Sequence, residues 1–200
     1  MAPTSDSGPR SSAEQGRSEH FREIILCHVE LLYRVAARMT GNHAEAEDVV
    51  QDTLLRAHQA FDRFELREHG AAAWLMKIMH NHIQSLRRRA GHEPDVRADG
   101  NLDAFAADPH QGEAPLASEG PLDWDQLDDE LKAAVSELEP EYRDVLLLWA
   151  LGDLKYREIA AVLDVPLGTV ESRLHRAREK LSRQLKEYAA RRGLRTGGRT

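Results

Sequence analysis

A segment near the middle of this chain of 200 residues, residues 90–124, sets the strongest limit on its architecture. It is rich in Gly, Pro, Ala and Asp, and its few large apolar side chains include Leu102, Phe105, Leu116 and Leu122. An unstructured stretch of this length is uncommon inside one compact domain. We therefore expect a flexible, acidic linker between two small domains, residues 19–89 and 125–188, which would move independently unless a partner clamps them.

The negative charge of the chain is concentrated in the same region. The formal net charge is −7, yet residues 90–130 carry twelve acidic residues against one basic residue, and residues 171–200 carry three acidic against ten basic. For nucleic-acid binding the location of charge matters more than its sum. The acidic total therefore does not exclude a nucleic-acid partner.

Both regions beside the linker show the apolar periodicity of helices, and neither shows a convincing strand. A helical stripe runs from Phe21 to Met39, Thr40-Gly41 supplies a stop, and Asn42 with Glu45 resembles a capping box that starts the next helix. We expect an all-α protein of two small helical domains. Residues 1–18, rich in Ser, Gly and Pro, are expected to form a disordered tail, and residues 189–200 a basic tail.

The helix that follows Asn42 carries polar residues away from its apolar side. These are Asp48, Gln51, Asp52 and Arg56. Taken alone, they are typical of a solvated helix face.

A third helix is expected from about Ala71 to Arg89. It ends in the basic triplet Arg87, Arg88 and Arg89, which Trp74, Lys77, Asn81 and Ser85 precede. Basic residues at a helix end interact favourably with the helix dipole. Combined with an aromatic ring and amides, they also fit DNA phosphates and unstacked bases. The residues alone leave both interpretations open.

The segment from Lys155 to Leu181 predicts two helices joined by a tight turn at Asp164-Val165-Pro166. In the second helix Val170, Leu174, Ala177 and Leu181 share one face, and short polar and basic side chains lie opposite. Such a helix fits a DNA major groove, where arginine binds guanine edges. The same pattern also occurs in plain helical hairpins with a solvated face.

Several classes of protein are excluded by what the sequence lacks. Cys27 is the single cysteine, so no internal disulfide or cysteine-built zinc site is expected. No apolar run approaches a membrane span and no signal peptide is present, which predicts a cytoplasmic protein without membrane insertion. No HExxH, glycine-rich phosphate loop or nucleophile elbow occurs, and His92 and His110 lack partners at metal-ligand spacing. We therefore expect no enzyme activity, no catalytic residues, no cofactor and no metal.

Three segments together resemble a known family. AEDVVQDTLLRAHQAFDRF is similar to the core-polymerase-binding helix of the extracytoplasmic-function (ECF) sigma factors, within the bacterial sigma-70 family. WLMKIMHNHIQSLRRR is similar to their helix that melts and reads the minus-10 promoter element. The segment LEPEYRDVLLLWALGDLKYREIAAVLDVPLGTVESRLHRAREKL resembles their minus-35-reading domain, which contains a helix-turn-helix. The resemblance covers roughly residues 20–89 and 126–185.

The resemblance implies a role for each group of residues. It places Asp48, Gln51, Asp52 and Arg56 against core RNA polymerase, whose β and β′ subunits would be the protein partners. It assigns Trp74, Lys77, Asn81, Arg87, Arg88 and Arg89 to minus-10 DNA, the three arginines meeting phosphates. It assigns Thr169, Glu171, Ser172, Arg173, His175 and Arg176 to minus-35 DNA, Thr169 meeting phosphate.

The family pattern also carries departures and a competing hypothesis. Ser85 stands where many members have aspartate, and Glu171 and His175 are positions that vary among promoter readers. The resemblance implies promoter DNA as a ligand and an anti-sigma factor as a regulatory partner. The alternative is a conventional helix-turn-helix regulator, which would not need the polar face around Asp48 and Asp52.

Overall fold

A computed structural model describes residues 9–61, 64, 70–91 and 124–191 of the chain. In order its helices are α1 (Pro9–Ile25), the 3-10 turn η1 (Leu26–His28), α2 (Val29–Thr40), α3 (His43–Ala60), α4 (Gly70–Arg89), η3 (Trp124–Gln126), α5 (Asp129–Ser136), α6 (Pro140–Ala150), α7 (Tyr156–Leu163) and α8 (Leu167–Arg191). No strand occurs among these described residues. The all-α prediction is confirmed, with the helix-turn-helix at α7 and α8.

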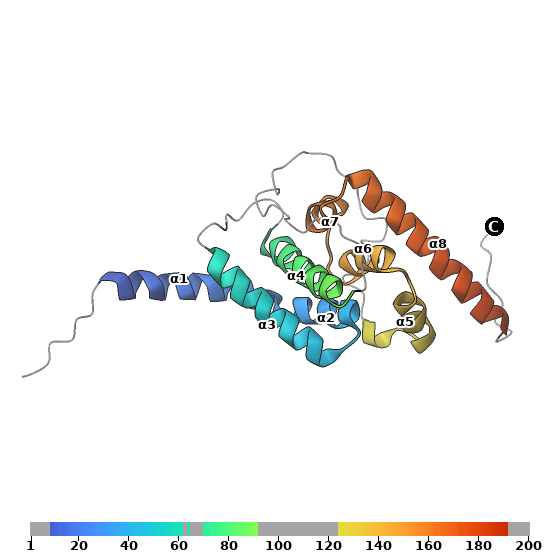
Figure 1. Ribbon diagram of the computed structural model, residues 1–200, viewed down its shortest axis with the longest axis horizontal. Helices are drawn as coiled ribbons and strands as arrows, with labels where there is room; N and C mark the ends of the chain where they lie inside the picture. Colours follow the sequence, from blue (N-terminus) through green and yellow to red (C-terminus); the bar gives the residue numbers. More distant parts are fainter. Residues whose placement is uncertain (1–8, 62–63, 65–69, 92–123, 192–200) are drawn as a thin grey trace, which may run out of the picture.

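The first helix begins earlier than the sequence predicts. Helix α1 starts at Pro9, so a disordered tail is wrong for residues 9–18, while residues 1–8 lie outside the described residues. The Arg17 guanidinium donates to the backbone oxygen of His58 at 2.9 Å, and the Phe21 ring packs edge-on against Phe61 at 5.1 Å. These contacts hold the carboxyl-terminal part of α1, while its other end extends away from the bundle (Figure 1).

Turn chemistry defines the boundaries of α2 and α3. Gly41 caps α2 in the left-handed conformation with φ 73°, which costs glycine little because it has no Cβ. The Asn42 side chain caps α3 by accepting from the N–H groups of Ala44 at 2.9 Å and Glu45 at 3.4 Å. The Asn42 N–H donates to Thr40 Oγ1 at 3.3 Å. In a full capping box the Glu45 side chain would accept from this N–H instead. The predicted helix start is thus correct, with a different partner for the second half of the motif.

The helix-turn-helix forms where the sequence predicts it. Helix α7 ends at Leu163, Asp164 takes a left-handed conformation with φ 55°, and α8 begins directly after Pro166. Helix α8 extends to Arg191, so residues 189–191 of the expected basic tail are helical and residues 192–200 lie outside the described residues. Of the expected linker, Ala90 and Gly91 form a turn after α4, residues 92–123 lie outside the described residues, and Trp124 is buried in η3.

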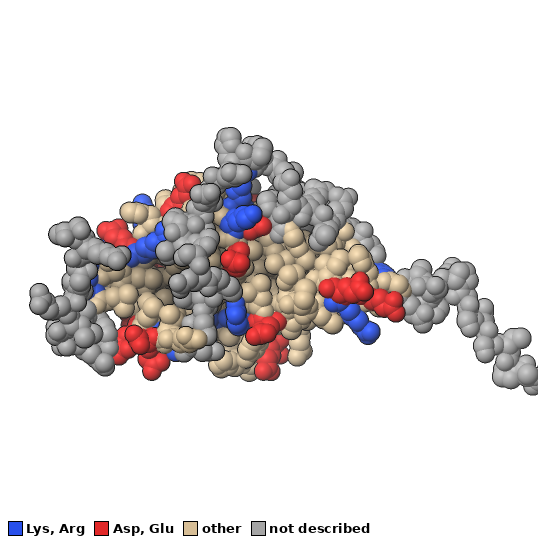
Figure 2. All heavy atoms as spheres, turned by 180° about the vertical axis from the view of Figure 1, so that it is seen from behind, with Lys and Arg blue, Asp and Glu red and all other residues tan. Residues whose placement is uncertain are grey.

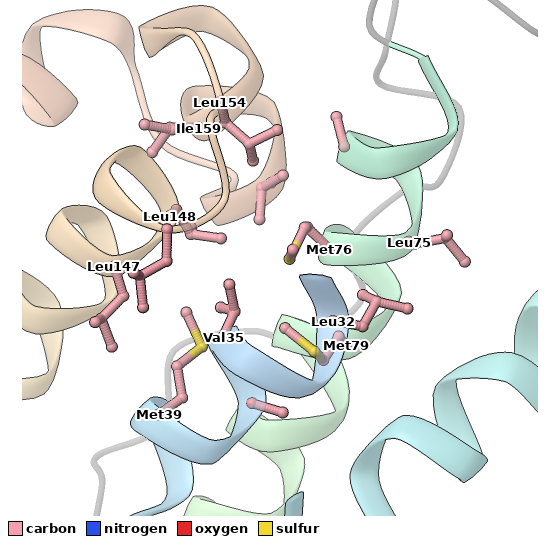
Figure 3. Close-up of a cluster of buried hydrophobic side chains, with 14 of the residues drawn as sticks. Leu32, Val35, Met39, Leu75, Met76, Met79, Leu147, Leu148, Leu154 and Ile159 are labelled. Carbon is pink, nitrogen blue, oxygen red and sulfur yellow. The ribbon is translucent and has the colours of Figure 1, made fainter. Parts of the chain in front are cut away.

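The apolar core is continuous across the two sequence-defined domains. Helices α2 and α4 pack against α6 and α7, so the first half of the chain directly contacts the second. Figure 3 shows the core side chains that converge there: Leu32, Val35, Met39, Met76, Met79, Leu147, Leu148, Leu154 and Ile159. In this structure each domain therefore covers an apolar face of the other, while independent movement of the two domains stays a prediction.

Candidate nucleic-acid interface

Helix α8 presents a polar face to solvent and an apolar stripe to the core. Val170, Leu174 and Ala177 are buried, as predicted, while Leu181 is half-buried. Of the predicted minus-35 residues, Glu171, Ser172, His175 and Arg176 are exposed, and Thr169 and Arg173 are half-buried on the flanks. The hydroxyl of Ser172 donates to the backbone oxygen of Thr169 at 3.0 Å. Exposed polar and basic side chains opposite a buried stripe are the arrangement that suits a helix in a DNA major groove.

The first turn of α6 contacts the basic side chains of α8. Arg173 lies 3.2 Å from the Glu141 carboxylate, and Arg176 donates to the Tyr142 hydroxyl at 3.5 Å. Lys180 pairs with Glu139, and this hydrogen bond holds the pKa of the Glu139 carboxyl below its ordinary value. Sequence reasoning missed these α6 partners. The available signal was chemical: Glu139, Glu141 and Tyr142 can pair with basic side chains, and α8 is rich in them.

The predicted minus-10 residues of α4 lie in a different setting. The Trp74 side chain is buried with its ring centroid 4.5 Å from that of Phe64. Lys77 is fully buried, and burial lowers the pKa of its ammonium group although the charge of Asp164, at the end of α7, opposes this. Asn81 is half-buried. Helix α4 packs against α7 in this structure, and of the residues assigned to DNA Lys77 lies near the charge of Asp164 at the end of α7.

The basic end of α4 is divided between solvent and the second domain. The guanidinium of Arg87 is bidentate to Asp144 on α6, at 2.6 Å from Nη1 to Oδ2 and 3.1 Å from Nη2 to Oδ1. The side chain of Arg88 stays on its own helix, donating to the backbone oxygen of Gln84 at 3.4 Å, and Arg89 is exposed. Arg87 is thus bound to a buried carboxylate of the second domain.

Asp144 gathers three side chains of α4 around one buried carboxylate, and we name these four residues the Asp144 cluster. Besides Arg87, Gln84 Nε2 lies 3.3 Å and His80 Nε2 3.5 Å from Asp144 Oδ2. Burial acts to raise the pKa of this carboxyl, but the hydrogen bonds and charges of His80 and Arg87 outweigh it and hold the pKa below its ordinary value. Sequence reasoning missed the cluster, although Asp144 directly precedes the apolar run VLLLWA and lies four residues before the buried Leu148, which places this acid on the buried side of α6.

The predicted polymerase-binding residues form an exposed face on α3. Asp48, Gln51, Asp52 and Arg56 all reach solvent, and Arg56 lies 3.8 Å from Asp52. Leu55 lies on the same side of the helix and is 59% exposed, the largest exposure of any big apolar side chain described. Sequence reasoning missed Leu55, although its spacing of three and four residues from Asp52 and Gln51 places it on this face.

One histidine links the α3 face to α4. His82 is buried, and its Nε2 lies 3.2 Å from the half-exposed carboxylate of Asp52. Burial, with the charges of Arg56 and Arg89, lowers the pKa of His82 despite the opposing charge of Asp52. His82 thus lies within hydrogen-bonding distance of Asp52 and limits the movement of that side chain.

The rest of the described surface carries charges of both signs. On the face seen in Figure 2, Lys and Arg are interspersed with Asp and Glu among uncharged residues. Within the described residues no group of three or more His, Cys, Asp or Glu side chains is arranged to hold a metal ion. None of the helices in the described part of the chain is long and apolar enough to cross a membrane.

Comparison with known proteins identifies both halves of the chain. Residues 24–93 match the family model of sigma-70 region 2, and residues 128–181 match that of sigma-70 region 4. The ECF RNA polymerase sigma factor SigL of Mycobacterium tuberculosis is 35% identical over 177 residues, covering 88% of this chain and 95% of SigL. This chain belongs to the ECF RNA polymerase sigma factors.

Two further relatives support the assignment. The ECF sigma factor SigE of Mycolicibacterium smegmatis is 31% identical over 180 residues, which are 90% of this chain and 65% of SigE, just under two thirds of that relative's length. The sigma factor RpoE of Bartonella quintana, solved in complex with the anti-sigma factor NepR, has a TM-score of 0.62 and 28% identity. That match covers 84% of this chain and 98% of RpoE. As an ECF sigma factor the chain is a promoter-recognition subunit and not an enzyme.

Proposed function

We propose that this sigma factor uses three separate faces: α3 binds core RNA polymerase, α4 captures the minus-10 element, and α8 reads the minus-35 element. The assignment of α8 is supported by the exposure of Glu171, Ser172, His175 and Arg176 above a buried stripe. The assignment of α3 is supported by its exposed polar residues around Leu55. A conventional regulator would have no use for that second face.

The observation that carries the proposal is the exposed, pre-arranged face of α8. Arg176 is exposed, and its guanidinium lies 3.5 Å from the Tyr142 hydroxyl. If Arg176 reads a base edge, Arg176→Ala should weaken binding by about 1–3 kcal/mol and change the preference at one promoter position. Selection from a promoter library with reconstituted holoenzyme measures both quantities.

Two arginine variants serve as comparisons. Arg183 lies on the same helix with its side chain 67% exposed, so Arg183→Ala removes an equal charge outside the predicted reading residues. Arg88→Ala should weaken all promoters alike, since phosphate contacts carry no sequence information. Identical, sequence-blind losses for Arg176→Ala and Arg88→Ala would refute the proposed division between base reading and phosphate binding.

The polymerase face has its own test. Asp48→Ala and Leu55→Ala should each weaken binding of the sigma factor to core polymerase, because one removes a charge and the other an exposed apolar contact. Glu23→Gln, an exposed acid on α1, is the matched control. Unchanged core affinity in both α3 variants, measured by fluorescence anisotropy, would argue against this face.

The minus-10 role requires a change of conformation. Lys77 is buried near the charge of Asp164 and Arg87 is held by Asp144, so these two residues become available to DNA only when α6 and α7 move away from α4. We therefore propose that core polymerase binds an open form of the chain. Unstacked bases captured by α4 would then contribute about 1–3 kcal/mol each.

A regulatory partner and a location complete the proposal. The Bartonella quintana relative is solved with an anti-sigma factor, and we propose that this chain is also held by one, in the cytoplasm where its polymerase works. Co-purification of the chain with the product of a neighbouring gene, followed by loss of transcription on adding that product, tests this assignment.

A further inference from the structure

The Asp144 cluster joins the two domains through a single buried carboxylate. Asp144 lies on α6, its side chain is 3% exposed, and the three side chains that contact its oxygens, those of His80, Gln84 and Arg87, all lie on α4. Each of these contacts crosses the interface between the two sigma regions. The carboxylate is therefore buried by the closed arrangement itself.

A buried ion pair gives little net stability, because removing both charges from water costs about as much as their attraction returns. Such a pair instead favours one relative orientation of the two domains, because any other orientation would leave a buried charge unpaired, which is strongly unfavourable. The apolar contacts in Figure 3 are not directional, so they fix the relative orientation of the two domains less strictly than a bidentate ion pair does. The Asp144 cluster selects the register in which Arg87 meets Asp144.

The same register covers the predicted minus-10 surface. Lys77, ten residues before Arg87 on α4, is fully buried and faces the charge of Asp164 on the other domain. A second cross-domain hydrogen bond, from Arg34 Nη2 to the backbone oxygen of Leu151 at 3.3 Å, supports the closed state. Opening would expose Lys77 and free Arg87 together.

Asp144 also resembles the ligand that Arg87 is expected to bind. Carboxylates and phosphates both present two oxygens to the planar fork of a guanidinium, and both favour the bidentate geometry seen here. In the closed chain both terminal nitrogens of Arg87 are engaged, because Nη2 also donates to the backbone oxygen of Met39 at 3.0 Å, and the side chain is only 14% exposed. A phosphate can take the same two-oxygen position only when Asp144 leaves it.

We propose that Asp144 is an internal competitor of promoter phosphate. It holds Arg87 and closes region 4 over α4, and the chain exchanges this carboxylate for a DNA phosphate when it opens. The proposal rests on the proposed minus-10 role of α4. It adds a specific contact by which the free sigma factor restrains its own DNA binding.

The first experiment measures opening directly. The full-length chain is treated briefly with an amine-acylating reagent, and modification of Lys77 is quantified by mass spectrometry. Asp144→Asn should raise Lys77 modification above the wild-type level. Asp129→Asn removes the same charge from a side chain that is 97% exposed, and it should leave Lys77 protected.

A second variant keeps the test valid if Asp144→Asn impairs folding. Gln84→Glu places a new carboxylate beside Asp144 without altering Asp144 or Arg87, so like-charge repulsion should open the interface. Far-UV circular dichroism verifies that each variant is folded. Wild-type protection of Lys77 in every folded variant would overturn the proposal.

The second experiment measures phosphate binding with single-stranded oligo(dT), which probes the backbone without a defined promoter. If the open form is about a tenth of the free chain, opening should tighten binding by up to roughly tenfold. One added phosphate contact should steepen the salt dependence of log K by about 0.7. Adding Arg87→Gln to Asp144→Asn should remove this gain while Lys77 stays reactive.

The two measurements separate the possible failures. If Lys77 became reactive but oligo(dT) binding did not tighten, the competitor proposal would be overturned. That result would also show that Arg87 does not bind phosphate in the proposed minus-10 role. Tighter binding that survives Arg87→Gln would overturn it as well, because another residue would then carry the gain. Only coupled changes that depend on Arg87 support the exchange.

Discussion

At the scale of single residues, several positions are fixed by very close contacts. Gly152 follows α6 where the chain turns back toward α7, and a Cβ built there would lie 2.5 Å from the backbone oxygen of Leu148. Its N–H donates to the backbone oxygen of Leu147 at 3.2 Å, so the turn cannot shift without losing that bond. No side chain fits this position without movement of the backbone.

Gly152→Ala should therefore lower the free energy of unfolding by about 1–3 kcal/mol, the usual cost of overpacking. Gly168→Ala is the matched control, because nothing lies within 4 Å of a Cβ at that exposed position in α8. It should be neutral or slightly stabilising, since alanine is the better helix former. Urea denaturation of both variants tests the difference, and equal stabilities would contradict the contact argument.

The lowered pKa of His82 makes a second residue-scale prediction. The folded chain resists protonating this buried imidazole, whereas the unfolded chain protonates it near pH 6.5. As the pH falls below that value the unfolded state gains protons first, so stability decreases until the folded pKa is reached.

His82→Gln should flatten the pH dependence of stability between about pH 7 and pH 5, since its amide can still meet Asp52 but does not titrate. His175→Gln, at an exposed position on α8, should leave that dependence unchanged. Thermal denaturation across this pH range measures the effect. A steeper loss of stability in His82→Gln than in the wild type would show that protonation of His82 does not destabilise the fold.

At the scale of elements, helix termini decide where the polymerase face is displayed. The Asn42 side chain meets two N–H groups at the start of α3, and the exposed residues from Asp48 to Arg56 follow from that start. Asn42→Ala should cost about 1 kcal/mol of stability, whereas Asn42→Ser should retain most of it because serine also caps. Chemical denaturation distinguishes the two variants. Equal losses would show that the cap contributes nothing.

The helical elements were largely predictable from local sequence. The periodicity of α3, α4, α7 and α8 and the turn at Asp164 appear in the chain itself, since they depend on neighbouring residues. The 3-10 break at Leu26–His28 and the early start of α1 were not predicted. At least for α1, the anchoring contacts, such as that of Arg17 with His58, come from another helix.

At the scale of the whole molecule, the two sigma regions form one folded body. Their apolar cores are continuous, and the Asp144 cluster links them at one polar point. The free chain should therefore unfold in a single cooperative transition in calorimetry, while Asp144→Asn should separate or broaden it. Two resolved transitions in the wild type would contradict a shared core.

Local sequence accounts for the helices, the family and the three groups of residues expected to bind polymerase and promoter. Those properties depend on residue spacing along single helices, which neighbouring residues record. Tertiary packing alone settles that α8 is exposed while α4 is covered, and that Arg87 binds Asp144. Arg87 and Asp144 are 57 positions apart, so their contact depends on which apolar faces of the helices pack together. Helical periodicity shows that a helix face is buried, but it does not show which other helix covers that face.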